Sequence, residues 1–231
     1  MSEPLRVALV AEGPTDRIVI EAAIANLLGN RSYVLRQLHP EESLAFGPLG
    51  TGWGGVYRWC QQAAGRSLGA LRNDPLFVMY DVLVLHLDAD VADSRYSEAN
   101  IVETVEDLPC AQPCPPPSAT TDLLRKVLLR WAGETAMPPR TVLCTPSKSA
   151  EAWVLKALFP KDKAVIGSTL ECLPDPEARF GQQPVTQRIK KTTRDYQARA
   201  SDLKEAWPRI ETSLSEAKRF SEDFRAAIPT L

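Results

Sequence analysis

Apolar runs of strand length, separated by turn residues, recur along the first two thirds of the chain. They cover residues 5–11, 32–38, 80–87 and 140–145, and the first and third are apolar at most positions. Runs of this kind are typical of strands buried on both faces, as in a parallel sheet. The pattern predicts four strands.

Helical periodicity lies between and after these runs. Residues 15–28 repeat apolar side chains at helical spacing before a Gly-Asn stop, and residues 56–71, 121–131 and 147–158 also read as helices. Strands that alternate with helices of this length favour right-handed crossovers, with helices on both faces of the sheet. The expected fold class is therefore α/β with a mostly parallel sheet.

Three segments depart from the alternation. Residues 39–55 are polar and glycine-rich, which predicts a loop that is flexible or faces a ligand. Residues 91–118 are rich in proline, and we expect an irregular insertion rather than packed elements. Residues 184–227 are polar and helical in character. We therefore expect an α/β domain over residues 1–158 and a helical C-terminal appendage over residues 159–231.

Composition narrows the class of protein. The 27 basic and 29 acidic side chains leave a net charge of -2, so there is no general attraction to nucleic acid or to an anionic membrane. No apolar run approaches the ~20 residues of a membrane-spanning helix. The scattered cysteines and the absence of a signal region predict a cytoplasmic protein. Cys110 and Cys114 lack a second metal-ligating pair, so we expect ordinary loop cysteines rather than a zinc site.

Acidic residues follow three of the predicted strands. Glu12 comes after the first, Asp88 and Asp90 after the third, and Glu151 one turn into the helix after the fourth. The carboxyl ends of parallel strands meet at one edge, where ligands bind. Carboxylates gathered there repel one another unless a cation is present, and such oxygen ligands suit Mg²⁺ or Mn²⁺. We expect a metal centre at this edge, with Asp16 as a further candidate ligand.

Each acid also has an ordinary structural explanation. Asp16 is placed to cap the first helix, and Glu151 to lie in the first turn of another. Asp88 and Asp90 could be a polar strand exit. Glu12 is harder to explain in this way, because an acid that closes a buried apolar strand is costly to desolvate without a partner. We therefore favour the metal centre.

The order of these motifs resembles a known domain. A strand, Glu-Gly-x-x-Asp at residues 12–16 and a helix, followed later by a strand and Asp-x-Asp at residues 88–90, resemble the TOPRIM domain. That domain is shared by topoisomerases, bacterial primases, small ribonucleases and the overcoming-lysogenization-defect nucleases. The resemblance covers residues 5–158. In particular, the chain is similar to small stand-alone TOPRIM-like bacterial proteins linked to phage defence, in which a stretch like residues 146–153 follows the next strand.

The resemblance implies a role for each matching residue. Glu12 would be a metal ligand or general acid/base, Asp88 and Asp90 the metal-binding pair, and Glu151 the later acid of the nuclease branch. Lys148 could neutralise charge that develops on a phosphate, or be a solvated lysine. The long spacing between the motifs and the proline-rich insertion are not part of the family pattern, so the substrate stays open.

Basic residues in the C-terminal tail offer contacts to a polyanion. The cluster contains Arg188, Lys190, Lys191 and Arg194, with Tyr196 as a stacking platform. Nearby acidic residues dilute this cluster, so an ordinary solvated helix face is the alternative.

The expected function is a divalent-metal-dependent nuclease that hydrolyses phosphodiesters of DNA or RNA, within a phage-defence system as the resemblance implies. The chain has no Walker motif, so ATP-driven control would come from an ATPase or another operon-encoded partner protein. Two alternatives remain open: a catalytically silent TOPRIM-like effector, sensor or protein-interaction module, and a small-nucleotide phosphohydrolase. Formation of a homo-oligomer is also left open.

Overall fold

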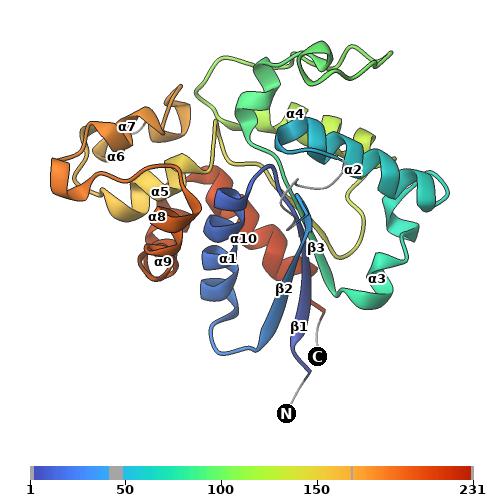
Figure 1. The fold of residues 1–231 in the computed structure, drawn as a ribbon, viewed down its shortest axis with the longest axis horizontal. Helices are drawn as coiled ribbons and strands as arrows, with labels where there is room; N and C mark the ends of the chain where they lie inside the picture. Colours follow the sequence, from blue (N-terminus) through green and yellow to red (C-terminus); the bar gives the residue numbers. More distant parts are fainter. Residues whose placement is uncertain (1–2, 42–48, 168, 230–231) are drawn as a thin grey trace.

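The computed structural model describes residues 3–41, 49–167 and 169–229, and within them four parallel strands form one sheet (Figure 1). Each strand coincides, apart from its ends, with a predicted apolar run. The α/β class and the parallel sheet expected from the sequence are confirmed. The strands are β1 (Leu5–Val10), β2 (Tyr33–His39), β3 (Val82–His86) and β4 (Thr141–Cys144), in the order β2-β1-β3-β4.

The register of the strands brings several chain segments to one edge. Val10 pairs with both His39 and Leu85, and His86 pairs with Cys144. Because all strands run in the same direction, the turns that follow β1, β3 and β4 leave the sheet close together. This carboxyl edge is where ligands bind in open α/β sheets.

One face of the sheet is covered by helices from both ends of the chain. Its core contains alternate strand residues, among them Val7, Val84 and Val142, and the aromatic pair Trp153 and Trp207. The C-terminal helices thus pack in the same core as the sheet (Figure 1). The helices of this layer are α1 (Pro14–Leu28), α5 (Glu151–Leu158), α9 (Ala200–Ser213) and α10 (Ser215–Ala227).

The opposite face packs against α2 (Gly52–Arg66) and α4 (Ser118–Trp131), with the short α3 (Leu76–Met79) nearby (Figure 1). The residues that alternate with those of the first core point to this side, so the sheet is buried on both faces as its apolar strands predict.

Helix α2 begins earlier than predicted, inside the stretch expected to be a loop. The glycines of that stretch serve close packing. A Cβ on Gly54 would lie 2.8 Å from the Cβ of Ala99, and one on Gly55 would lie 2.4 Å from Nε2 of His39. Residues 42–48 of the predicted loop lie outside the described residues.

The proline-rich insertion is irregular, as predicted, but the expectation that it does not pack is wrong. Tyr96, Ile101 and Leu108 are buried in the second core. The Tyr96 hydroxyl donates to Asp107 at 2.6 Å and accepts from Arg130 of α4 at 2.7 Å. These contacts fasten the insertion to α4, because a buried hydroxyl is costly to leave without partners.

The other described helices are short, and no described helix is long and apolar enough to cross a membrane. The short α-helices are α6 (Lys163–Ile166), α7 (Ala178–Gly181) and α8 (Thr193–Gln197), and the 3₁₀ helices are η1 (Leu71–Asn73), η2 (Ala89–Asp93), η3 (Tyr96–Ala99), η4 (Leu170–Cys172) and η5 (Val185–Gln187).

Candidate metal centre

Three potential metal ligands come together at the carboxyl edge of β1 and β3. A carboxylate oxygen of Glu12, a ring nitrogen of His86 and a carboxylate oxygen of Asp88 all lie within 4.8 Å of one another. Glu12 follows β1, His86 ends β3, and Asp88 comes shortly after it. His86 and Asp88 are buried, and Glu12 is half-buried.

Each of these side chains has a second contact that holds it in place. The Asp88 N–H donates to Glu12 Oε1 at 2.7 Å, which ties the end of β3 to the turn after β1. The Ala150 N–H, in the loop after β4, donates to Asp88 Oδ1 at 3.0 Å. Nε2 of His86 lies 3.1 Å from the same Asp88 oxygen. Metal ligands are commonly oriented by contacts of this kind.

The loop after β4 reaches this position because backbone pairing continues beyond β3. The N–H groups of Ala89 and Asp90 donate to the carbonyls of Pro146 and Lys148, at 3.1 and 2.9 Å. The loop therefore runs alongside the segment that carries Asp88. Helix α5 starts only at Glu151, later than the predicted start at residue 147 or 148, because the preceding residues make these pairs.

A second group of charged side chains adjoins the first. Glu151 is 1% exposed, and its Oε1 accepts from the Tyr196 hydroxyl at 2.9 Å and lies 3.1 Å from Lys191 Nζ. Asp16, in the first turn of α1, is 4% exposed and interacts electrostatically with His86, Glu151 and Lys191. One site therefore contains acidic side chains from several chain segments, and Lys191 of the C-terminal part of the chain lies beside them.

Several buried polar atoms of this site have no hydrogen-bond partner among the residues that the structure describes. They are Asp16 Oδ1, His86 Nδ1 and Glu151 Oε2. Buried polar atoms almost always have a partner, and the exceptions need an explanation. Unpartnered atoms from three separate elements fit a site whose contacts are completed by a bound ligand.

Burial and mutual repulsion make the charged forms of these acids unfavourable. Burial, followed by repulsion from Asp88, raises the pKa of Glu12 well above its usual value. Burial also raises the pKa of Asp16, and it raises the pKa of Asp88 to about 7 although His86 opposes that shift. Burial would lower the pKa of His86, but Asp88 and the other acids outweigh it and raise this pKa to about 9. The site therefore favours bound protons or another cation over free carboxylates.

The donor atoms fit a divalent cation. Carboxylate oxygens suit Mg²⁺ and Mn²⁺, whereas an imidazole nitrogen shifts preference towards transition metals. As a ligand, His86 would have to release the proton that its raised pKa favours, and its nitrogen would shift the preference towards transition metals such as Mn²⁺. With His86 serving only to orient Asp88, the remaining oxygens accept either ion.

Only some of the predicted ligands belong to this group of three. Glu12 and Asp88 belong to the group of three, and Asp16 and Glu151 are buried beside it. Asp90 is exposed and lies outside that group, although its charge interacts with those of Glu151 and Lys191. The role of each acid in metal binding stays a prediction.

His86 is the member of the group that the sequence analysis misses. It interrupts an apolar run, which hides its relation to Asp88. A usable signal exists, because side chains two residues apart lie on the same face of a strand. A histidine within a buried strand therefore shares a face with an acid two positions later.

The predicted basic residues divide between the site and the surface. Lys191 points towards Glu151, whereas Arg188, Lys190 and Arg194 are exposed. Tyr196 is 1% exposed and donates to Glu151, so its expected role as a stacking platform is wrong.

Lys148, the predicted catalytic lysine, lies at the rim of the site. Its Nζ is 3.4 Å from Asp93 Oδ2, and its side chain is 24% exposed. It also lies near enough to Asp90 for the two charges to interact. Its catalytic role stays a prediction.

Comparison of the chain with protein-family models, with curated proteins and with solved structures found no match. What the chain does is therefore inferred from its own residues and their arrangement.

Proposed function

We propose that this protein is a divalent-metal-dependent nuclease, which hydrolyses phosphodiesters of nucleic acid. The proposal is carried by one observation: Glu12, His86 and Asp88 offer ligand atoms within 4.8 Å of one another at the carboxyl edge of a parallel sheet. Asp16 and Glu151 are both buried, each has one oxygen with no partner in the described part of the chain, and both extend the site. So many buried acids in one place are costly without a cation.

The residues have distinct roles in this proposal. A bound Mg²⁺ or Mn²⁺ would supply a Lewis acid and lower the pKa of a water molecule. Glu12 and Asp88 would hold the ion, and the backbone N–H of Ala150 orients Asp88. Lys191 keeps Glu151 paired and places a positive charge at the site, where it can offset negative charge on a phosphate.

The resemblance to the TOPRIM domain supports the same reaction. Its two acidic motifs, at residues 12–16 and 88–90, follow β1 and β3, which are neighbouring parallel strands. The phage-defence setting and an ATPase partner rest on this resemblance alone. A neighbouring ATPase gene would support them.

A polymeric substrate is favoured over a small nucleotide by the basic residues near Lys191. Arg188, Lys190 and Arg194 are exposed, and they flank the lysine that contacts Glu151. Exposed basic side chains of this kind can contact phosphates beyond the reacting group, and a polymer carries such phosphates on both sides of the cleaved bond.

The test combines metal binding with cleavage. Mn²⁺ and Mg²⁺ binding to the wild type is measured by calorimetry, and cleavage is measured on single- and double-stranded DNA, on RNA and on free nucleotides. Glu12→Gln and Asp88→Asn should lose metal binding and cleavage together. Glu98→Gln, which changes an exposed acid on η3, should keep both.

Other results would point elsewhere. Hydrolysis of nucleotides but not polymers would favour the small-nucleotide phosphohydrolase. Metal binding without any hydrolysis would favour the silent interaction module. A wild type that binds neither ion, or an Asp88→Asn variant that cleaves as well as wild type, would overturn the proposal.

A further inference from the structure

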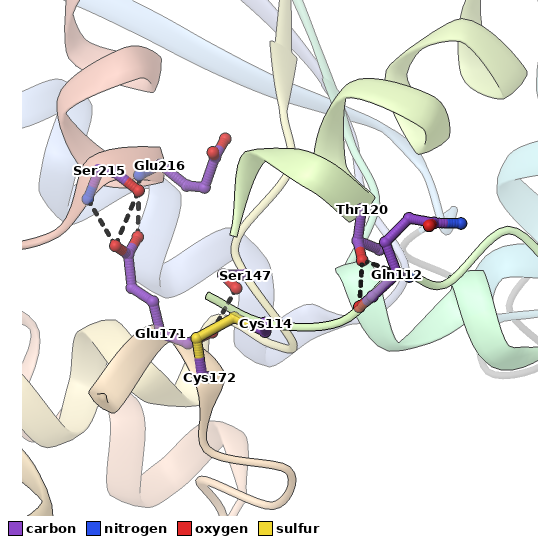
Figure 2. Close-up of a disulfide and its surroundings, with 8 residues drawn as sticks. All are labelled: Gln112, Cys114, Thr120, Ser147, Glu171, Cys172, Ser215 and Glu216. Carbon is purple, nitrogen blue, oxygen red and sulfur yellow. Dashed lines mark hydrogen bonds between the residues drawn. A yellow bond between two sulfur atoms is a disulfide. The ribbon is translucent and has the colours of Figure 1, made fainter. Parts of the chain in front are cut away.

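A disulfide joins the end of the proline-rich insertion to the segment that precedes α7. Cys114 and Cys172 are 58 residues apart in sequence, and their Cα atoms lie 5.5 Å apart, within the usual range for disulfides (Figure 2). The expectation that Cys114 is an ordinary loop cysteine is therefore wrong. Both cysteines are half-buried, so a small thiol can approach the bond.

On the Cys172 side, the neighbouring Glu171 makes contacts in two directions. Its backbone carbonyl accepts from the Ser147 hydroxyl. Its carboxylate accepts from the N–H groups of Ser215 and Glu216, at 2.8 and 2.9 Å, where α10 starts (Figure 2). The disulfide thus fastens a residue that bridges the loop after β4 and a helix packed on the sheet.

Ser147 connects this contact to the candidate metal centre. It lies in the loop at residues 145–150, and the Ala150 N–H of the same loop donates to Asp88 Oδ1 at 3.0 Å. The position of this loop therefore affects the orientation of Asp88. A continuous run of contacts leads from the disulfide to a candidate metal ligand.

On the Cys114 side, the chain is fastened close to the start of α4. The Gln112 N–H donates to Thr120 Oγ1 at 2.9 Å, and the Thr120 hydroxyl donates to Gln112 O at 3.2 Å (Figure 2). The disulfide consequently joins two segments that approach the carboxyl edge from different strands. One is the insertion after β3, and the other contacts the loop after β4.

We propose that Cys114 and Cys172 form a thiol-sensitive brace of the metal centre. The disulfide holds the loop at residues 145–150 where Asp88 requires it, and reduction loosens that loop. The expected loss of metal affinity rests on the proposed function. The expected loosening of the loop at residues 145–150 does not depend on it.

Reduction follows ordinary thiol–disulfide exchange. A thiolate of glutathione attacks one sulfur of the bond, which forms a mixed disulfide and releases the other cysteine as a thiolate that takes up a proton. A second glutathione thiolate then attacks the mixed disulfide and releases the first cysteine in the same way. Two glutathione molecules are oxidised to one glutathione disulfide, while the bond is reduced to the two thiols of Cys114 and Cys172. Oxidation by glutathione disulfide reverses the sequence.

The other cysteines are poorly suited to this exchange. Burial raises the pKa of the Cys60 thiol to about 12, and burial with nearby acids raises that of Cys110 to about 11. Few thiolates then form near neutral pH. Cys144 is completely buried in β4.

The test compares the full-length chain before and after reduction with glutathione. Alkylation followed by mass spectrometry of the unreduced chain should find Cys114 and Cys172 in one linked, unlabelled peptide pair. After reduction, hydrogen exchange of the Ala150 and Asp90 amides should become faster. Mn²⁺ affinity should fall about tenfold or more, as is typical when the contacts that orient a metal ligand are lost.

Two variants separate the brace from a general loss of structure. Cys110→Ser alters a cysteine of the same insertion that is outside the disulfide, and it should respond to reduction as the wild type does. Ser147→Ala keeps the disulfide but removes the contact to Glu171. Its Ala150 amide should exchange quickly in both redox states, so reduction should change little further.

The outcomes that count against the proposal are distinct. Free Cys114 and Cys172 thiols in the oxidised chain would overturn the brace, and so would unchanged Ala150 exchange after complete reduction. If exchange responds as expected but Mn²⁺ binds in neither state, the brace stands and the proposed function is overturned.

Discussion

The metal-free protein should become more stable when Asp88 is replaced by Asn. In the fold, burial raises the pKa of Asp88 from 3.8 to about 7, although His86 opposes the shift. A raised pKa in an acid means that folding disfavours its charged form. The cost is therefore absent below the unfolded pKa and complete above the folded one. The asparagine side chain would lack the charge but keep an oxygen that accepts from the Ala150 N–H.

The size of the gain follows from the pKa shift of Asp88. A rise of about three pKa units corresponds to about 4 kcal/mol of unfolding free energy. The attraction of Asp88 for His86 is already contained in this value, because it lowers the pKa of Asp88. The gain at about pH 8 should therefore be at most about 4 kcal/mol, and it should vanish as the pH falls to about 4.

Urea denaturation at about pH 8, with EDTA or with Mn²⁺, measures this gain. At a Mn²⁺ concentration about one hundred times its Kd, the wild type should gain about 2.7 kcal/mol and Asp88→Asn close to nothing. Glu98→Gln is the matched control and should follow the wild type in both conditions. A purely structural role for Asp88 predicts the reverse, a loss of about 3–5 kcal/mol without metal. Such a loss would refute the charge argument.

Three other measurements probe the site and the fold. Calorimetric titration across a range of pH should show that Mn²⁺ affinity decreases once the pH is lower than about 7, because protons then compete for Asp88, whose pKa lies near that value. An affinity independent of pH would contradict this. Lys191→Met should leave Glu151 without its cation, and it should slow cleavage more than it weakens Mn²⁺ binding. Because one third of the lysine side chain is exposed, urea denaturation should show a stability loss of only about 1–2 kcal/mol. Gly133→Ala should lower the melting temperature, since Gly133 has a φ of 72° and an added Cβ would lie 2.0 Å from Gly69 O. Gly65→Ala, whose Cβ meets open space, is the control. Equal melting temperatures of the two variants would count against this packing.

The sheet could be predicted from the sequence because its strands are buried on both faces. Such strands read as nearly continuous apolar runs, and β3 is the clearest of them. The start of α2 could not, because glycine usually marks loops. Gly54 and Gly55 instead allow the helix to approach Ala99 and His39, a tertiary contact that no local pattern records.

The candidate site was predictable to the extent that its residues follow strands. Glu12 and Asp88 lie where parallel topology brings chain segments together. Lys191 reaches Glu151 only because the C-terminal segment folds back over the sheet edge, and spacing along the chain does not reveal that. The pairing of Cys114 with Cys172 was hidden for a similar reason, since disulfide connectivity cannot be read from a sequence.

The central claim is that Glu12 and Asp88, with His86 beside them, hold a divalent cation. Anomalous X-ray diffraction from crystals grown with Mn²⁺, recorded above and below the manganese absorption edge, locates the ion directly. We expect a manganese peak in contact with the carboxylates of Glu12 and Asp88 in the wild type, and its loss in Asp88→Asn crystals. A manganese peak elsewhere, or none at a concentration that saturates binding in solution, would contradict the metal centre.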